Sequence, residues 1–570
     1  MPSSMSSSPD SSKAMRHAAS VLVLRDGPRG MEVLLMQRPE RSDDRSSGAW
    51  VFPGGTLDAQ DVSLHPLCVG LDDAEASARL EVTDGGLDYY LCAIREAFEE
   101  AGLLFAHHAG APVGGAPLIK VDALEDATLD MLRDAARYGG KGLAHVCETL
   151  KLRIAVDRLV YVSHWLTPPG LPKRFDTRFF LAQLPPGQTA AHDGIEAVAH
   201  RWIRPAEALE TSSGMSFVNV TRKMLQSISH FRSAQACIDY AREQRSIVRI
   251  MPRLANGPKG VRPVMPEEAP YAEIGRIDPD GAGHARYALE PDVAVQLSDR
   301  VIRVTANNGN VMTGPGTNTY LIAGANGDWA VLDPGPDDAA HVDAVLAAAP
   351  GPIRWILVTH THLDHSPATV HLREATGATV LGRTTAVQDR QDPTFAPDRA
   401  PVHGERIELG PDVTLRVVHT PGHASNHLCY LLEQEKLLFT GDHVMQGSTV
   451  VINPPDGDMH AYLKSLHALL DEDLEWIAPG HGFLMPSPHD AIRLLIRHRQ
   501  QREAKVVNAL RTLGPAAIAT VLASVYDDVP ERMHPVAQRS LLAHLRKLVV
   551  DGVAVEDGGL WGLAKPSVAN

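Results

Sequence analysis

The sequence predicts a multi-domain α/β protein, and three observations support this prediction. The chain has 570 residues, which corresponds to three or four domains at about 150 residues each. Short β-rich runs alternate with helical segments between residues 290 and 497, as in α/β layer folds. A proline-rich segment, residues 251–289, interrupts the pattern. Because such a density of prolines stops both helices and central strands, we expect a linker there.

Composition narrows the class of protein further. Hydrophobic residues make up 44% and charged residues 22% of the chain, and the net charge is −15. These values are typical of a globular protein, and the acidic balance provides no overall attraction for nucleic acid. The five cysteines form no CxxC pair, which favours reduced thiols. No apolar run is long enough to cross a membrane, and residues 1–15 are expected to be a disordered tail. We therefore expect a cytoplasmic protein without membrane contact.

The first domain, expected over residues 16–250, contains a helix rich in carboxylates. In AIREAFEEAGLL, Glu96, Glu99 and Glu100 have the spacing i, i+3 and i+4, so they share one helical face. Clustered like charges repel one another unless a cation gathers them, and oxygen ligands favour Mg²⁺ or Mn²⁺. A solvated acidic face is the alternative explanation.

With the upstream VFPGGTLDAQD, this helix resembles the Nudix box of the Nudix hydrolases. Asp61 stands where the box has its first glutamate, and residues 62–94 replace a much shorter spacer. A coenzyme A diphosphatase-like subgroup is similar in carrying a long insertion there. The resemblance implies an αβα sandwich that cleaves a nucleoside diphosphate linked to another group, such as coenzyme A or acyl-CoA. It implies that Glu96, Glu99 and Glu100 bind Mg²⁺ or Mn²⁺, that Arg95 orients a glutamate, and that Arg95 and Glu99 are catalytic.

The second domain, expected over residues 290–497, has candidate metal ligands at the ends of predicted strands. In WILVTHTHLDHS an apolar run is followed at once by four of them, and three later β-rich runs end in one each. The seven residues are His360, His362, Asp364, His365, His423, Asp442 and His481. Imidazole suits zinc, and seven groups suit two ions rather than one tetrahedral ion. Four separate strand-end placements make ordinary core histidines the weaker explanation.

These motifs resemble those of the metallo-β-lactamase superfamily, whose mark is HxHxDH with later His, Asp and His ligands. The resemblance implies an αββα sandwich with two Zn²⁺ ions, or Mn or Fe, and a bound hydroxide as the nucleophile. It implies that His360, His362 and His423 hold one metal, that Asp364, His365 and His481 hold the other, that Asp442 bridges them, and that Asp364 is also catalytic. TGPGTNTYLI and HTPGHASNH are similar to the β-lactamase-like protein 2 family, which includes an endoribonuclease. By that similarity His427 is a catalytic proton donor, with a packing role as the alternative.

The last segment, residues 498–570, is expected to be a small winged-helix domain like the one in that family. Its end, GVAVEDGGLWGLA, predicts a hairpin with Gly558 and Gly559 at the turn. Arg539, Arg546 and Lys547 make one helix mildly basic. Nucleic-acid binding, a solvated face and a dimer contact remain open explanations.

The leading hypothesis is a bifunctional metal-dependent hydrolase that acts on small molecules, nucleotides or coenzyme A derivatives. Its upstream site would be a pyrophosphatase, and its downstream site would hydrolyse an ester, a thioester or a phosphodiester by means of a bridging hydroxide. In one version both sites act on coenzyme A thioesters, the second on the thioester and the first on the diphosphate. In the alternative, the downstream site is an endoribonuclease acting on RNA, and the Nudix part cleans up nucleotides or is a degenerate binding or oligomerisation module. The sequence leaves the substrates, the native metals and the oligomeric state open, a homodimer being one option.

Overall fold

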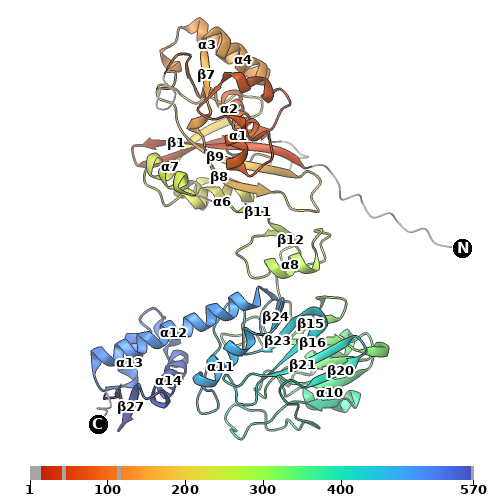
Figure 1. Ribbon diagram of the computed structural model, residues 1–570. Helices are drawn as coiled ribbons and strands as arrows, with labels where there is room; N and C mark the ends of the chain where they lie inside the picture. The colour runs from red at the N-terminus through yellow and green to blue at the C-terminus, as the bar shows by residue number, and fades with distance from the viewer. Residues whose placement is uncertain (1–14, 41–46, 112–116, 245, 566–570) are drawn as a thin grey trace, which may run out of the picture. The chain divides into compact units, whose positions relative to one another are not determined.

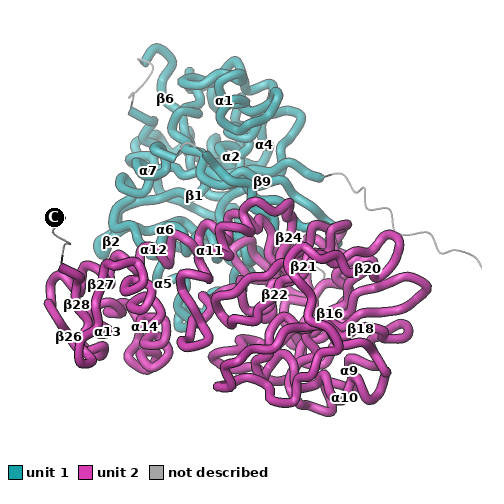
Figure 2. The backbone as a smooth tube through the Cα atoms, turned by 60° about the horizontal axis from the view of Figure 1, so that its bottom comes forward, with its two compact units in different colours: residues 1–252 teal, residues 253–570 magenta. Residues whose placement is uncertain are grey.

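The computed structural model describes residues 15–40, 47–111, 117–244 and 246–565. The chain divides into two compact units, residues 1–252 and 253–570, which Figure 2 colours separately. Of the expected disordered tail, residues 1–14 lie outside the described residues. None of the helices in the described ranges is long and apolar enough to cross a membrane. All five cysteines are free thiols.

The upstream unit is built on a mixed sheet in the order β10-β2-β1-β9-β8-β11, in which β1 runs parallel to β9. The strands are β1 (Arg16–Gly27), β2 (Gly30–Gln37), β8 (Val160–Leu166), β9 (Phe175–Gln183), β10 (Ala199–Ile203) and β11 (Arg249–Ile250), with the short β3 (Trp50–Val51) and β4 (Gly54–Thr56) attached. Figure 1 shows α2 (Gly86–Ala101) on one side of the sheet, and α6 (Asn219–Ile228) and α7 (Ala234–Glu243) on the other. The unit is therefore an αβα sandwich, and Tyr90, Ile94 and Phe98 of α2 are buried in its core.

The insertion at residues 62–94 is folded. It contains the 3₁₀ helix η1 (Asp61–Leu67), β5 (Cys68–Val69), α1 (Asp73–Leu80) and the first part of α2. Helix α1 starts at a capping box, in which Asp72 and Glu75 each accept a hydrogen bond from the other's backbone N–H. A small sheet joins β5 to β7 (Leu152–Ala155) and β6 (Ala106–His108), beside α3 (Asp126–Ala135) and α4 (Gly139–Thr149). Because Leu71 and Leu80 are buried in the main core, the insertion enlarges the core instead of looping into the site.

The downstream unit contains two six-stranded sheets packed face to face. The first has the order β14 (Ala294–Gln296), β15 (Val301–Thr305), β16 (Asn318–Ala323), β17 (Trp329–Leu332), β18 (Ile353–Leu357), β19 (Thr379–Leu381). The second has the order β20 (Arg406–Gly410), β21 (Val413–His419), β22 (Leu428–Leu432), β23 (Leu437–Gly441), β24 (Trp476–Pro479), β25 (Met485–Pro486). Tyr320, Leu357, Tyr430 and Phe439 belong to one buried cluster that joins the two sheets.

Helices cover the outer face of each sheet. Helices α9 (Ala339–Ala348) and α10 (Thr369–Thr376) share an apolar cluster with the first sheet, and α11 (Met459–Leu469) and α12 (Pro488–Leu513) share one with the second. The unit is thus an αββα sandwich. Strands β17 and β18 are parallel, as are β23 and β24, and the carboxyl ends of parallel neighbours lie at the same edge of a sheet.

The proline-rich segment, expected as a linker over residues 251–289, contains short elements of its own, β12 (Arg253–Ala255), β13 (Arg262–Val264) and α8 (Tyr271–Ile277). Glu273 of α8 forms a bidentate ion pair with Arg303 of β15, at 2.7 and 2.9 Å, and both side chains are only 2% exposed. This buried pair fixes the segment to the downstream sandwich. The domain boundaries that we expect from the sequence stay a prediction.

The C-terminal end of α12 packs with a small domain made of α13 (Ile518–Val525), α14 (His534–Val550) and a three-stranded sheet, β26 (Ala516–Ala517), β27 (Ala554–Asp557) and β28 (Leu560–Leu563). Its core includes Leu510, Leu545 and Trp561. Gly558 and Gly559 join β27 to β28 with φ of 55° and 81°, the left-handed conformation that a two-residue hairpin turn requires. The predicted hairpin and the multi-domain α/β fold, with a small domain of helices and a three-stranded sheet at its C-terminal end, are confirmed.

Candidate active sites

In the downstream unit, the loops that follow β18, β21, β23 and β24 carry all seven histidines and aspartates singled out in the sequence. The structure brings them together as two groups, whose ligand atoms lie within 4.8 Å of one another inside each group. The first group is His360, His362 and His423, and the second is Asp364, His365, Asp442 and His481.

The three histidines of the first group point ring nitrogens at a common position. His362 Nδ1 lies 2.9 Å from His360 Nε2 and 3.0 Å from His423 Nε2. Burial lowers the pKa of His362 to about 3 and that of His360 well below its usual value. The rings of His360 and His362 are therefore neutral and offer lone pairs, which is the form of histidine that binds a metal.

Asp442 connects the two groups. Its Oδ1 lies 3.2 Å from His481 Nε2 and 3.4 Å from His365 Nε2, and its Oδ2 lies 3.6 Å from His423 Nε2. Asp364 Oδ2 lies 3.4 Å from His481 Nε2. One oxygen of Asp442 thus faces each group, which is the arrangement that a bridging carboxylate needs.

Unpartnered buried atoms show that this site fits metal ions. Asp442 Oδ1 and the Nε2 atoms of His365 and His481 are buried without a hydrogen-bond partner, and such atoms are costly to leave unsatisfied. Although burial opposes the charged form of His481, the nearby carboxylates of Asp442 and Asp364 raise its pKa to about 9. A divalent cation among these atoms would satisfy them in place of that proton, and the mixed imidazole and carboxylate set suits zinc, manganese or iron.

Contacts on the far side of each ring fix its orientation. His423 Nδ1 donates to the carbonyl of Val451 at 2.8 Å, His481 Nδ1 donates to that of Gly316 at 3.1 Å, and His360 Nδ1 lies 3.0 Å from Thr359 Oγ1. These partners leave the opposite nitrogen of each ring free for a metal.

Asp333 is a further member of this site that our sequence interpretation missed. It follows β17 and lies 3.0 Å from His365 Nδ1. The signal was present in WAVLDPG, where an apolar run ends in an acidic residue, as it does before Asp442.

His427, the predicted proton donor, is fully buried behind the first group. Its ring centroid lies 5.0 Å from that of His360, and its Nδ1 lies 2.9 Å from Thr420 Oγ1. Burial lowers its pKa well below the usual value. His427 is not among the residues that line the cavity described next, and its catalytic role stays a prediction.

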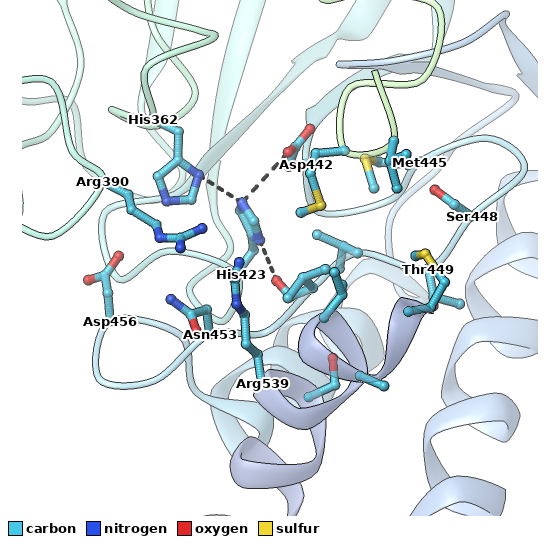
Figure 3. Close-up of a pocket in the computed structure, with 18 of the residues that line it drawn as sticks. His362, Arg390, His423, Asp442, Met445, Ser448, Thr449, Asn453, Asp456 and Arg539 are labelled. Carbon is cyan, nitrogen blue, oxygen red and sulfur yellow. Dashed lines mark hydrogen bonds and ion pairs between the residues drawn. The ribbon is translucent and has the colours of Figure 1, made fainter. Parts of the chain in front are cut away.

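A cavity of about 570 Å³ opens onto the two ligand groups through His362, Asp364, His423 and Asp442, and Figure 3 shows it with His362, His423 and Asp442 labelled. Many of its lining side chains are apolar, among them Val311, Met312, Leu363, Val387, Met445, Val450, Val451, Val529, Met533, Val536 and Ala537. The walls come from sandwich loops and from the winged-helix domain, so both parts shape the space beside the ligands.

In the upstream unit, Arg95 organises the carboxylates of α2. It donates to Asp61 Oδ1 at 2.8 Å, to Glu96 Oε1 at 2.8 Å and to Glu99 Oε1 at 3.2 Å. Asp61 is fully buried. The aspartate that stands in place of the first glutamate of the box therefore still pairs with Arg95, despite the long insertion that follows it.

A cluster of three carboxylates lies beside this network and consists of Glu96, Glu100 and Glu196. Glu196 was not anticipated, because it lies on a loop far from α2 in the sequence, and Glu99 lies outside the cluster. Burial raises the pKa of Glu96 to about 7, and burial together with the charge of Glu96 raises that of Glu100 well above its usual value. Carboxylates that resist ionisation together fit an Mg²⁺ or Mn²⁺ ion.

Comparison with known proteins identifies the family. A family model described as the metallo-beta-lactamase superfamily matches residues 312–481, and a beta-lactamase associated winged helix domain matches residues 518–561. A beta-lactamase-like protein 2 homolog of Drosophila melanogaster is 33% identical over 285 residues, covering 46% of this chain and 92% of the relative. The chain belongs to the metallo-β-lactamase superfamily.

The upstream part of the chain matches the models of the NUDIX domain over residues 15–117 and of the NUDT19 Nudix domain over residues 71–217. The protein is therefore a hydrolase that joins two families of hydrolytic enzymes.

Other relatives include enzymes of known reaction class. An atrochrysone carboxyl ACP thioesterase of Aspergillus fumigatus is 30% identical over 271 residues, covering 46% of this chain and 82% of the relative. Among solved structures, a metallo-beta-lactamase family protein of Thermus thermophilus is 21% identical with a TM-score of 0.41, covering 47% of this chain and all of that chain.

Proposed function

We propose that the downstream site hydrolyses a thioester with an apolar acyl group, and that the upstream site cleaves the diphosphate of a nucleotide derivative such as coenzyme A or acyl-CoA. The observation that carries the first half is the cavity of about 570 Å³, whose largely apolar walls reach the two ligand groups. An apolar acyl chain buries its surface in such a space, and the reacting carbonyl then lies beside the ligands.

The residues of the downstream site have distinct roles in this proposal. His360, His362 and His423 would hold one divalent cation, and Asp364, His365 and His481 would hold the other, with Asp442 between them. When bound, the two cations would activate a water and polarise the carbonyl oxygen of the thioester. Asp364 lines the cavity, so in our proposal its carboxylate receives the proton that water loses and passes it to the departing thiolate.

Two considerations favour a thioester over RNA as the downstream substrate. Surfaces that bind single-stranded RNA are grooves with stacked aromatic rings, whereas eleven aliphatic and methionine side chains line this cavity and Tyr526 is the one Phe, Tyr or Trp among its described lining residues. The thioesterase name of the Aspergillus fumigatus relative supports the same choice. Endoribonuclease activity is the alternative that the assays below must separate.

In the upstream site, Arg95 holds Glu96 and Glu99 in place, and Gly54 N–H donates to Glu100 Oε2 at 3.2 Å. Glu96, Glu100 and Glu196 would hold Mg²⁺ or Mn²⁺, which would draw charge from the diphosphate and activate a water against phosphorus. Glu99 stays our candidate for a catalytic base. The two sites together suit one class of substrate, because an acyl-CoA contains both a thioester and a diphosphate.

The test separates the two sites in the full-length chain. Wild type, Asp364→Asn and Glu96→Gln are assayed on acyl-CoA thioesters, on coenzyme A, on ADP-ribose and on single-stranded RNA, with metal content measured in each. We expect Asp364→Asn to abolish only thioester cleavage and Glu96→Gln to abolish only diphosphate cleavage. The exposed Asp412→Asn and Glu148→Gln serve as matched controls. Cleavage of RNA without any thioester cleavage by wild type would refute the downstream proposal, and diphosphate cleavage that survives Glu96→Gln would refute the upstream one.

A further inference from the structure

Helix α14 of the winged-helix domain forms one wall of the downstream cavity. Val536, Ala537 and Ser540 of the helix and its N-cap residue Met533 all line the cavity, and their spacing of three and four residues places them on one face. Arg539, three residues after Val536, lines the same cavity. Figure 3 shows its side chain extending from the helix toward the side of the cavity that holds Asn453 and His423.

The position of this helix is fixed by packing and ion pairs. Ala543 is buried in the apolar cluster that contains Val444 and Ile492 of the sandwich. On the same helix, Lys547 pairs with Glu503 of α12 at 2.9 Å. Because these contacts hold α14 against the sandwich, Arg539 has a defined place in the cavity wall.

Four arginines line the cavity, and two of them are engaged elsewhere. Arg499 donates to the carbonyl of Val450 and lies over the ring of Tyr462, with 5.5 Å between its guanidinium carbon and the ring centroid. Arg502 donates to the carbonyl of Val525 at 2.7 Å and to Asp528 at 2.8 Å. These two guanidinium groups are therefore occupied within the protein.

The other two arginines, Arg390 and Arg539, keep donors available. Arg539 has no side-chain hydrogen bond or ion pair within the part of the chain that the structure describes. Arg390 is about half exposed and has only Asp389, at 3.9 Å, beside it. Figure 3 shows Arg390 on the side of the cavity next to His362 and Asp456.

The acidic side chains of the lining do not neutralise Arg539. Asp364 and Asp442 belong to the second ligand group. Asp456 accepts hydrogen bonds from Thr385, Gln391 and Ser425. A half-buried guanidinium without a counterion is costly unless a ligand supplies the negative charge.

We propose that Arg539 binds an oxyanion of the substrate, with Arg390 as a second cation on another wall, so that the winged-helix domain supplies a specificity residue to the downstream active site. The planar guanidinium matches a carboxylate or a phosphate oxygen pair. The oxyanion is a carboxylate on the acyl part or a phosphate on the thiol carrier. This inference rests on the proposed thioester function and adds that the substrate is anionic close to the reacting bond.

A set of four thioesters tests the inference and separates the two sources of the anion. The acyl part is valeryl or glutaryl, which differ in a terminal carboxylate, and the carrier is pantetheine or 4′-phosphopantetheine, which differ in a phosphate. Loss of a hydrogen-bonded charge pair raises KM about 10- to 100-fold. We expect this increase of KM in Arg539→Gln, with kcat little changed. It should appear for the two glutaryl thioesters if the enzyme recognises the carboxylate, or for the two 4′-phosphopantetheine thioesters if it recognises the phosphate.

Two further variants make the result specific. Arg539→Lys keeps the charge and should recover part of the affinity. Arg546→Gln removes an exposed arginine of the same helix that does not line the cavity, and it should leave every KM unchanged. An equal effect of Arg539→Gln on all four thioesters, or none on any, overturns the inference.

Equilibrium binding keeps the test independent of turnover. Calorimetric titration of the zinc-loaded full chain with glutarate and with 4′-phosphopantetheine should show one of them bound at least tenfold more weakly by Arg539→Gln. The role of Arg539 is overturned if wild type and Arg539→Gln bind both compounds with equal affinity, or if wild type binds neither compound. If wild type hydrolyses none of the four thioesters, the proposed function fails and the titration alone decides about Arg539. The inference is overturned as well if Arg539→Gln changes only the cleavage of RNA and none of the thioester or binding measurements.

Discussion

The carboxylate of Asp333 lies 3.0 Å from Nδ1 of His365. Both side chains are buried, and Asp333 also accepts hydrogen bonds from the backbone N–H and the hydroxyl of Thr359, at 2.7 and 2.8 Å. His365 Nδ1 is therefore the protonated nitrogen, and its Nε2 faces Asp364 and Asp442. Asp333 thus sets the tautomer in which His365 can serve as a ligand.

Replacing Asp333 should weaken metal binding without removing a ligand. Asp333 has a φ of 50°, a conformation that asparagine tolerates, so Asp333→Asn keeps the backbone and removes the charge. We expect affinity for the second zinc ion to fall about 10- to 100-fold, measured by competition with a chromophoric chelator. The exposed Asp337→Asn is the control, and unchanged zinc affinity in Asp333→Asn would contradict the role assigned to this carboxylate.

Breaking the buried Glu273–Arg303 pair should destabilise the downstream unit. Glu273→Gln leaves Arg303 buried without its counterion and weakens the hydrogen bond from Leu484 N–H, so we expect a loss of about 3–5 kcal/mol. Hydrogen exchange of β15 and β16 in the full-length chain measures it locally. Glu290→Gln, which breaks the more exposed pair with Arg286, should cost less than about 1 kcal/mol. If β15 and β16 were protected from hydrogen exchange to a similar degree in the two variants, the buried pair would not be needed for the stability of this unit.

A methyl group at Gly55 should disable the upstream site alone. A Cβ there would lie 2.2 Å from Glu96 Oε1, so Gly55→Ala must displace the carboxylate from the cluster with Glu100 and Glu196. We expect Mn²⁺ binding to the upstream unit and diphosphate cleavage to be lost, and downstream hydrolysis in the same preparation to be retained. Electron paramagnetic resonance of free Mn²⁺ measures the binding. Wild-type Mn²⁺ affinity in Gly55→Ala would rule out Glu96 as a ligand.

Acid should destabilise the winged-helix domain through His544. Burial lowers the pKa of His544 in the folded chain, outweighing its hydrogen bond to Glu503, whereas in the unfolded chain it titrates near 6.5. The unfolded state therefore binds more protons below about pH 6.5, and folding stability falls as the pH falls through that value. We expect His544→Leu to reduce this pH dependence, as followed by hydrogen exchange in α14 and β28. The exposed His467→Leu is the control, and an unchanged pH dependence in His544→Leu would assign the effect to other groups.

Much of the fold and of the candidate sites could be predicted from local sequence patterns. An apolar β-rich run that ends in His or Asp predicts a buried strand and the position of a ligand, as before His360, Asp442 and His481. These patterns are local, because strand formation depends on neighbouring residues and parallel pairing brings strand ends to one edge. The helical spacing in α2 likewise placed Glu96 and Glu100 on one face.

The sequence by itself thus determined the two hydrolase folds, the residue types at both sites and the hairpin at Gly558. Only the tertiary structure brought Glu196 to Glu96 and Glu100 and turned Glu99 toward Arg95. It also separated three basic residues of α14 that are alike in the sequence, since Lys547 pairs with Glu503, Arg546 is exposed and Arg539 lines the cavity. These distinctions depend on contacts between residues far apart in the chain, and no local periodicity encodes which partner a charged side chain meets.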